Sequence, residues 1–158
     1  SFIRPGLDRG SWTCRSNCPA VGLVQTGETE MSLYLQAHYM LPSYHLRRYS
    51  MRLDGFASIN APFAGGEMTT KLLQFTGSKL ELNFSGSSVG GIRVEIQDEA
   101  GVALKGYALE DCDLVYGDEI ARTVTWQKQA DVSSLAGQPV KLRFAMKDAD
   151  LYALQFVD

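Results

Sequence analysis

Apolar and polar side chains alternate along several short stretches of the chain, and a period of two is the pattern of a half-buried β-strand. Met31, Leu33, Leu35 and Ala37 alternate with polar neighbours, so residues 31–38 are predicted to form one strand. The further predicted strands cover residues 44–52, 67–75, 79–84, 92–97, 120–126, 140–146 and 151–157. Short strands without a long amphipathic helix indicate an all-β sandwich or barrel.

Turn-forming residues separate these strands. The Gly- and Ser-rich stretch 85–91 predicts a flexible loop, and residues 131–137 predict a single helical turn that starts at an aspartate and stops at a glycine. Residues 1–29 carry several prolines and glycines and are predicted to be irregular. We therefore expect an antiparallel, jelly-roll-like β-sandwich over residues 51–158, preceded by an irregular arm and a β-hairpin over residues 1–50.

The hairpin offers a candidate binding surface. If its turn has four residues, Tyr39 pairs with Tyr44 and Ala37 pairs with Leu46, so that one face is apolar and the other carries rings beside polar groups. Sugars bind such faces, because their C–H surfaces stack on aromatic rings and their hydroxyls pair with planar polar groups. The predicted sugar-facing residues are Tyr34, Gln36, His38, His45, Arg47 and Tyr49. A one-residue slip exchanges the faces, and a solvated face or a protein-covered face is the alternative.

The remaining aromatic residues are sorted by the face that they share with their neighbours. Trp126 has the parity of Val124 and is predicted to lie in the core, as is Tyr152, which has the parity of Leu154 and Phe156. The aromatic candidates for an exposed sugar contact are Tyr107 and Tyr116, which flank an acidic loop.

That acidic loop is a candidate calcium site. Calcium takes several oxygen ligands, often from one loop, and the predicted ligands are Glu110, Asp111, Asp113, Asp118 and Glu119. Their spacing differs from that of a helix-loop-helix calcium site. The alternative is a solvated loop, or a loop whose carboxylates pair with Arg93 or Arg122. A structural calcium ion is the only cofactor that the sequence suggests.

Composition and charge limit the classes of partner that this chain can have. The chain has 158 residues, of which 45% are hydrophobic and 21% charged, as in a globular protein. A net charge of −3 lacks the excess of basic residues that a nucleic-acid-binding protein usually carries, and no apolar run is long enough to span a membrane.

The chain starts at Ser1 without a signal peptide or initiator Met, as a processed or excised protein would. The spacing of Cys14 and Cys18 leaves a disulfide and free thiols both open.

No motif predicts catalysis. The only histidines, His38 and His45, adjoin no nucleophile elbow of the hydrolase type. A glycoside hydrolase needs two carboxylates facing each other across a cleft, and nothing in the sequence places such a pair. The pairs open to that interpretation are Glu110 with Asp118 and Asp148 with Asp150. We therefore expect a non-enzymatic protein.

Several motifs occur together from about Arg47 to the end of the chain. They are RYSMRLDGFAS at 48–58, GGEMTTK at 65–71, IRVEIQD at 92–98, LEDCD at 109–113, GDE at 117–119 and KDADLY at 147–152. In combination they resemble the C-terminal region of bacterial glycoside-hydrolase-like proteins that join a five-bladed β-propeller to a β-sandwich. Residues 4–6 and 12–17 look like the end of the propeller.

The resemblance implies that most of the propeller, with its catalytic carboxylates, lies outside this chain, so no catalytic residue is carried over. It implies a secreted or periplasmic accessory module that binds a polysaccharide or oligosaccharide and holds the catalytic domain of a larger protein near it. The alternative is a structural support domain that packs against the propeller and binds no sugar.

Overall fold

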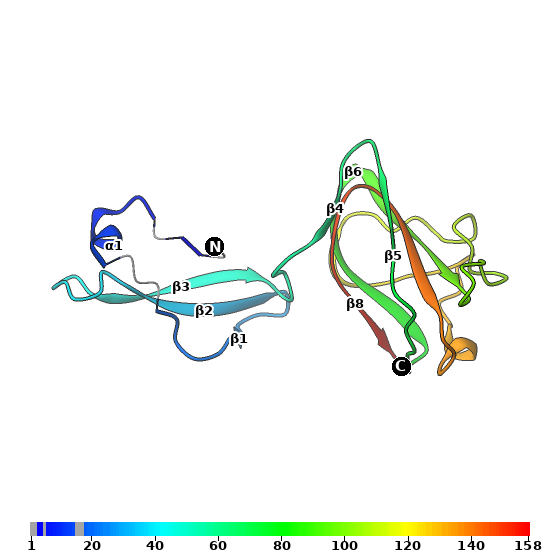
Figure 1. Cartoon of the computed structure of the whole chain (residues 1–158), viewed down its shortest axis with the longest axis horizontal. Helices are drawn as coiled ribbons and strands as arrows, with labels where there is room; N and C mark the ends of the chain where they lie inside the picture. The colour runs from blue at the N-terminus through cyan, green and yellow to red at the C-terminus, as the bar shows by residue number, and fades with distance from the viewer. Residues whose placement is uncertain (1–2, 5, 15–17) are drawn as a thin grey trace. The chain divides into compact units, whose positions relative to one another are not determined.

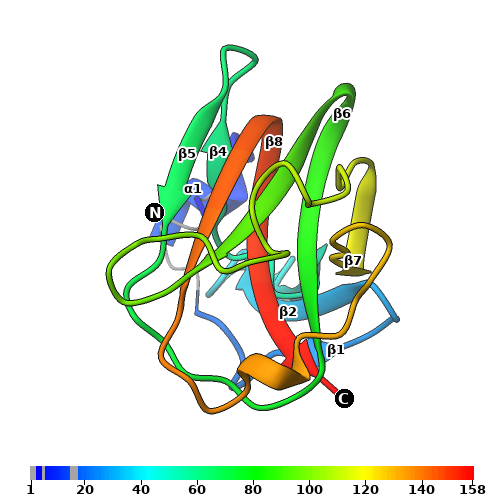
Figure 2. The ribbon, with the colours of Figure 1, turned by 90° about the vertical axis from the view of Figure 1, so that its right-hand side faces the viewer.

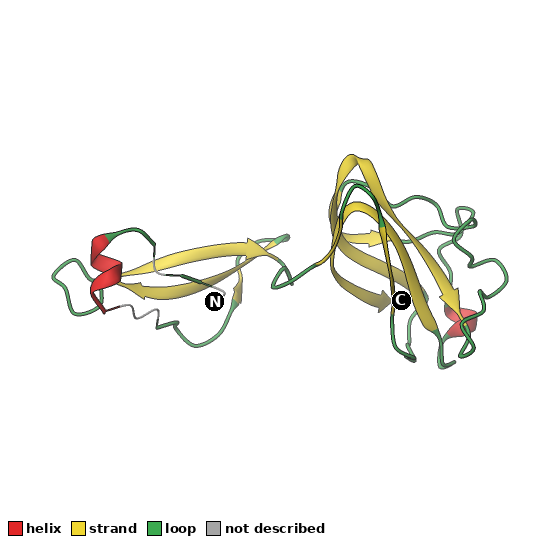
Figure 3. Ribbon diagram, turned by 45° about the horizontal axis from the view of Figure 1, so that its top comes forward, coloured by secondary structure: helices red, strands yellow, loops and turns green. Residues whose placement is uncertain are grey.

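A computed structural model describes residues 3–4, 6–14 and 18–158, without the side chains of residues 13 and 14. The described chain is nearly all β-structure with antiparallel pairing, which confirms the predicted fold class (Figure 1, Figure 3). It forms two compact units, Ser1–Phe56 and Ala57–Asp158. Within the described residues, no helix is long and apolar enough to cross a membrane.

The first unit is a small antiparallel sheet with one short helix. Its elements are α1 (Arg9–Cys14), β1 (Val24–Gln25), β2 (Glu30–Ala37) and β3 (His45–Arg52), and the strand order is β1-β2-β3. The helix corrects the prediction that residues 1–29 are irregular. Asp8 starts it, because its carbonyl accepts the N–H of Ser11 and its carboxylate accepts the N–H of Gly10 at 3.1 Å.

The predicted pairing of the hairpin is wrong by one residue. The structure pairs Ala37 with His45 and Gln36 with Leu46. The connection spans residues 38–44 in two successive turns, which the N–H groups of Leu41 and Tyr44 close on the carbonyls of His38 and Leu41. This odd-length connection replaces the predicted four-residue turn and moves every side chain of β3 to the opposite face.

The second unit is one curled sheet. Its elements are β4 (Ile59–Ala61), β5 (Gly66–Thr69), β6 (Lys79–Gln97), β7 (Asp118–Thr123), the 3-10 helix η1 (Ser133–Leu135) and β8 (Lys141–Val157). The long strands β6 and β8 pair along most of their length. β4 and β5 pair with different halves of β8, and β7 pairs with the first half of β6 (Figure 2).

The two long strands cross positions where breaks were predicted. β6 runs through residues 85–91, so the predicted loop there is wrong, and β8 joins the two strands predicted on either side of residues 147–150. Their pairing shifts between Gly86 and Gly91, which marks an irregular stretch where both strands bend. The bends curl the sheet around a core that includes Phe84 and Phe144, so the unit is sandwich-like.

Bulges also change which side chains face the core. Asn83 pairs with Ala153 but Phe84 pairs with Leu151, so Tyr152 is the extra residue of a bulge. Tyr152 is half-buried and lies outside the core, contrary to its predicted parity. Its hydroxyl lies 3.3 Å from Ser85 Oγ.

Two other local predictions hold. Trp126 is 2% exposed, and its Nε1–H donates to the carbonyl of Val94 at 2.8 Å. The predicted helical turn is η1, where the carboxylate of Asp131 accepts the N–H of Ser133 at 2.8 Å. Gly137, the predicted stop, has a φ of 76°, a value that glycine adopts without strain.

The bend of β6 depends on a glycine. A Cβ on Gly90 would lie 2.5 Å from the carbonyl oxygens of Lys147 and Asp148, which are backbone atoms of the paired strand. We therefore expect Gly90→Ala to lower the free energy of unfolding by about 1–3 kcal/mol. Gly66→Ala is the matched control, because its Cβ would meet nothing closer than 3.8 Å. Urea unfolding measures both variants, and equal stability of the two would contradict this account of the bend.

Candidate functional site

An open pocket of about 450 Å³ lies on the Ala57–Asp158 unit, where β6 and β8 bend. Its lining residues are 64–67 from the β4–β5 turn and β5, 89–91 and 93 from β6, Leu114, and 145–147 from β8. Four of them are glycines, which leave the backbone of the wall uncovered. The pocket therefore combines open backbone groups with three charged side chains, those of Glu67, Arg93 and Lys147.

The register of the sheet gathers the charged side chains of the pocket. Ala145 on β8 pairs with Glu67 on β5 and with Arg93 on β6. Directly opposed residues of antiparallel strands project from the same face, so Glu67 and Arg93 flank the small side chain of Ala145. Lys147 is paired with Gly91 two residues along the same strands, and therefore lies on the same face. The pocket thus lies on the face opposite the core residues Phe144 and Val94.

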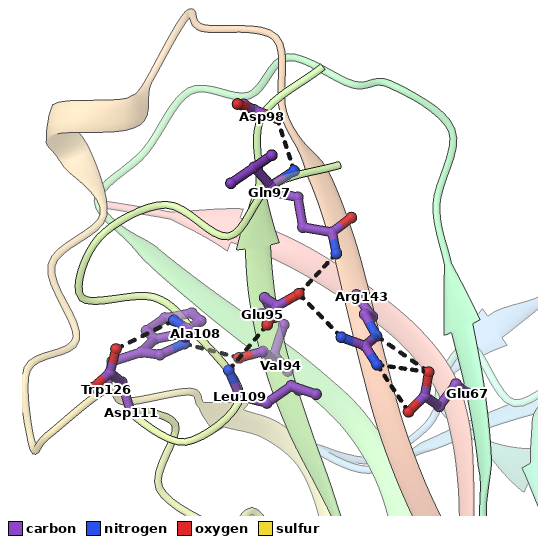
Figure 4. Close-up of polar contacts among 11 residues, drawn as sticks. Glu67, Val94, Glu95, Gln97, Asp98, Ala108, Leu109, Asp111, Trp126 and Arg143 are labelled. Carbon is purple, nitrogen blue, oxygen red and sulfur yellow. Dashed lines mark hydrogen bonds and ion pairs between the residues drawn. The ribbon is translucent and has the colours of Figure 1, made fainter. Parts of the chain in front are cut away.

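Arg143 holds the carboxylate of Glu67 in place (Figure 4). Its Nη2 donates to both oxygens of Glu67, at 3.0 and 2.9 Å, and its Nε donates at 3.2 Å. This fork geometry fixes the plane of the carboxylate. The side chain of Glu67 is still 55% exposed, so it retains lone pairs that face solvent and can accept hydrogen bonds from a ligand.

Glu95, on β6, holds Arg143 from the side opposite to Glu67. Glu95 is buried, and it accepts bonds from Gln97 Nε2 at 2.7 Å, from the N–H of Leu109 at 3.2 Å and from Arg143 Nη1 at 3.3 Å. Burial alone would raise the pKa of Glu95, but these three donors outweigh it and lower the pKa below its usual value. The two carboxylates in turn raise the pKa of Arg143, so it stays charged.

Two further cations border the pocket. Arg93 Nη1 donates to the carbonyls of Leu109, at 3.4 Å, and Cys112. Lys147 is exposed, and its Nζ lies 4.3 Å from the centre of the Phe63 ring. Within the described part of the chain, neither Arg93 nor Lys147 takes part in an ion pair. Counting Arg143, which Glu67 and Glu95 share, three cations stand against two carboxylates here, so the site keeps a net positive charge.

Phe63 gives this site an aromatic edge. It is 62% exposed, in the turn where the N–H of Gly65 donates to the carbonyl of Pro62 at 2.8 Å. The same carbonyl accepts the N–H of Asp148 at 3.1 Å, so the turn is tied to β8. A single exposed ring is common on protein surfaces, but this one lies beside a pocket, so a ligand in the pocket can contact it.

The six predicted hairpin residues do not form one surface. Tyr34 and Gln36 project from one face of β2, whereas His45, Arg47 and Tyr49 are paired with the apolar residues of β2 and project from the other. His38 lies beyond the strand, where its Nε2 binds Asp8 and its Nδ1 lies 2.8 Å from Ser43 Oγ. The bond to His38 is the main cause that lowers the pKa of Asp8. The hairpin site predicted from a four-residue turn is therefore divided between two faces.

Tyr107 and Tyr116 have different surroundings. Tyr107 is half-buried against Trp126, with ring centres 5.3 Å apart, and its hydroxyl donates to the carbonyl of Asp131 at 3.0 Å. Tyr116 is 61% exposed, as predicted. Only Tyr116 of the two presents a ring to solvent that is free to stack on a ligand.

The acidic side chains of the predicted calcium site point to separate partners. Asp113 accepts bonds from Thr125 Oγ1 and from the N–H of Lys128, and the bond from Thr125 is the main cause that lowers its pKa. Asp111 is bonded to Gln127. Glu119 pairs with Arg122, which was the predicted alternative. Glu110 is exposed, and Asp118 begins β7.

Among residues 3–4, 6–14 and 18–158, no three side chains of His, Cys, Asp or Glu come together as a metal site. Calcium binding by the acidic loop stays a prediction. Cys18 is exposed, and the side chain of Cys14 lies outside the described residues, so neither the disulfide nor the free thiols that their spacing leaves open is tested. Cys112 is buried, and burial raises the pKa of its thiol, as expected of a structural cysteine rather than a nucleophile.

Sequence reasoning missed the pocket. The sequence feature that could have indicated it is a pair of double glycines, Gly65-Gly66 and Gly90-Gly91. Each is followed within two residues by a charged residue. Only the register of the sheet shows that these two segments meet. No known protein family, curated protein or solved structure matches this chain.

Proposed function

We propose that this chain is a non-catalytic carbohydrate-binding module of a secreted or periplasmic carbohydrate-active protein, and that the open pocket on β5, β8 and β6 is its sugar site. The observation that carries the proposal is the exposed Phe63 ring with the Lys147 amine over it, next to a pocket in which Arg143 holds the Glu67 carboxylate in a fixed plane. The resemblance to glycoside-hydrolase-like proteins points to the same class of ligand.

The chemistry of the pocket suits a sugar ring. The C–H face of a pyranose stacks on an exposed aromatic ring, and its hydroxyls donate to carboxylates and accept from guanidinium and amine groups. Phe63 supplies the ring, Glu67 the acceptor, and Arg93 and Lys147 the donors. An open pocket buries little of each sugar, so weak binding per site is expected. Such a module acts by tethering, which raises the local concentration of its catalytic neighbour near a polysaccharide.

The test is affinity gel electrophoresis of the full chain on a panel of soluble polysaccharides. We expect retardation on at least one polysaccharide, and we expect Phe63→Ala to reduce it about fivefold or more, because stacking on an exposed ring is worth about 1 kcal/mol or more. Tyr116→Ala is the matched control, since the Tyr116 ring is equally exposed, whereas only the Phe63 ring is in contact with the lining residue Lys147. Loss of retardation in Tyr116→Ala but not in Phe63→Ala would move the site to the acidic loop and contradict the proposal.

A second function, structural support of a neighbouring domain, is favoured by the surface of the first unit. Its exposed apolar residues include Leu7, Val21, Met40 and Leu46, and Leu46 is 60% exposed near the start of the edge strand β3. Exposed apolar residues of this size in one small unit are typical of a surface that packs on other protein. Absence of retardation on every polysaccharide of the panel would favour this function over sugar binding.

A further inference from the structure

The proposed sugar site carries a charge pattern that points to a class of glycan. The chain as a whole is acidic, with a net charge of −3. The pocket runs against this balance, because Arg93 and Lys147 border it and its single lining carboxylate, Glu67, is already paired with Arg143. Local positive charge on an acidic protein selects for anionic ligands and raises their rate of association.

The two cations are also placed differently from ordinary surface cations. Arg93 is held by two backbone carbonyls through one nitrogen, Nη1, which leaves the rest of the guanidinium fork for a ligand. Lys147 is kept above the Phe63 ring, so the amine and the stacking surface lie together. A sugar that displaces the exposed Lys147 amine from this face and stacks on Phe63 would keep the amine next to its substituents.

We infer that the pocket takes an acidic glycan, in which a sugar ring stacks at Phe63 and an anionic substituent, carboxylate or sulfate, pairs with Lys147 and Arg93. Glu67 accepts hydroxyl hydrogen bonds on the other side of the same sugar. This inference rests on the proposed function, since it names the ligand class of that same site. Charge-assisted bonds from guanidinium to carboxylate are about twice as strong as neutral ones, so the anionic group contributes much of the selectivity.

The experiment compares matched polysaccharides by affinity electrophoresis of the full chain. Polygalacturonate is the carboxylate probe, and fully methyl-esterified polygalacturonate is the same backbone without charge. Dextran sulfate and dextran form the corresponding sulfate pair, and polyglutamate is a polyanion without sugar. We expect at least fivefold stronger retardation on one charged member than on its neutral partner and on polyglutamate.

Variants connect that selectivity to the pocket. We expect Lys147→Glu to reduce retardation on the charged probe fivefold or more and to reduce retardation on the neutral partner by a clearly smaller factor, because the amine also donates to sugar hydroxyls. Lys105→Glu is the matched control, because it makes the same change of charge at an exposed lysine outside the pocket lining. Equal effects of the two variants, or equal binding of polyglutamate, would overturn the inference. Binding of neutral sugars alone, lost in Phe63→Ala, would overturn it and leave the proposed function standing, whereas binding of no probe would overturn both.

Discussion

Trp126→Ala is expected to lower the free energy of unfolding of the Ala57–Asp158 unit by about 3–5 kcal/mol. The indole is 2% exposed and packs edge-on against Tyr107, with ring centres 5.3 Å apart. Its Nε1–H is bonded to the carbonyl of Val94 at 2.8 Å, so its removal leaves a cavity and an unpaired acceptor together. Small domains have a free energy of unfolding of only about 5–15 kcal/mol, so this loss is a large part of the total stability.

Trp126→Phe keeps the measurement informative if the alanine variant does not fold. Phenylalanine fills most of the volume but lacks the donor, and an unpaired buried acceptor costs about 1–3 kcal/mol. Urea unfolding followed through the NMR signals of Val94 and Ile96 reports on this unit alone. A loss below 1 kcal/mol in Trp126→Ala would mean that the indole does not fill the core.

Arg143→Gln is expected to lower the free energy of unfolding at neutral pH, because removal of one partner leaves the charge of Glu95 buried without its cation. The side chain of Glu95 is 8% exposed and that of Arg143 is 32% exposed, so solvent reaches the arginine more than the carboxylate. The bonds from Gln97 and Leu109 to Glu95 remain in the variant. Arg122→Gln, which removes a surface pair with Glu119, is the control with an expected loss of at most about 0.5 kcal/mol.

The pH dependence of this effect has a defined sign. The pKa of Glu95 is lowered in the folded chain, so its contribution to stability is present above the pKa of the unfolded state, about 4.3, and is lost as pH falls through the folded value. Without Arg143 the burial of Glu95 is less compensated, and its folded pKa rises. The stability difference between wild type and Arg143→Gln should therefore shrink as pH falls below about 4. A difference that stays constant from pH 7 to pH 3 would contradict the role given to this ion pair.

The sequence predicted the class of the fold because strand alternation is a local signal. Trp126 and Val124 share a parity, and both are buried as expected, although β7 ends at Thr123 and they follow it. Alternation fails where a bulge inserts a residue, and Tyr152 is such a case, since the shift in pairing with β6 is a property of two strands together. The prediction of a loop at 85–91 was wrong for a different reason: glycines that suggest a break in a strand also permit a bent strand.

The candidate site was less accessible from the sequence. The hairpin interpretation depended on the length of one turn, and an odd-length connection moved His45 and Tyr49 to the face opposite Tyr34. The pocket depends on the pairing of Ala145 with both Glu67 and Arg93, three residues far apart in the chain. No local pattern encodes that meeting, although the double glycines mark the two segments that take part in it.

The most direct test of this account is an NMR titration of the uniformly ¹⁵N-labelled full chain with trigalacturonate, repeated with its methyl ester. The account predicts shifts at the amides of Gly66, Gly91 and Lys147 with the charged sugar, and smaller shifts with the ester. Shifts confined to the hairpin residues Tyr34 to Tyr49, or no shift anywhere with either sugar, would contradict it.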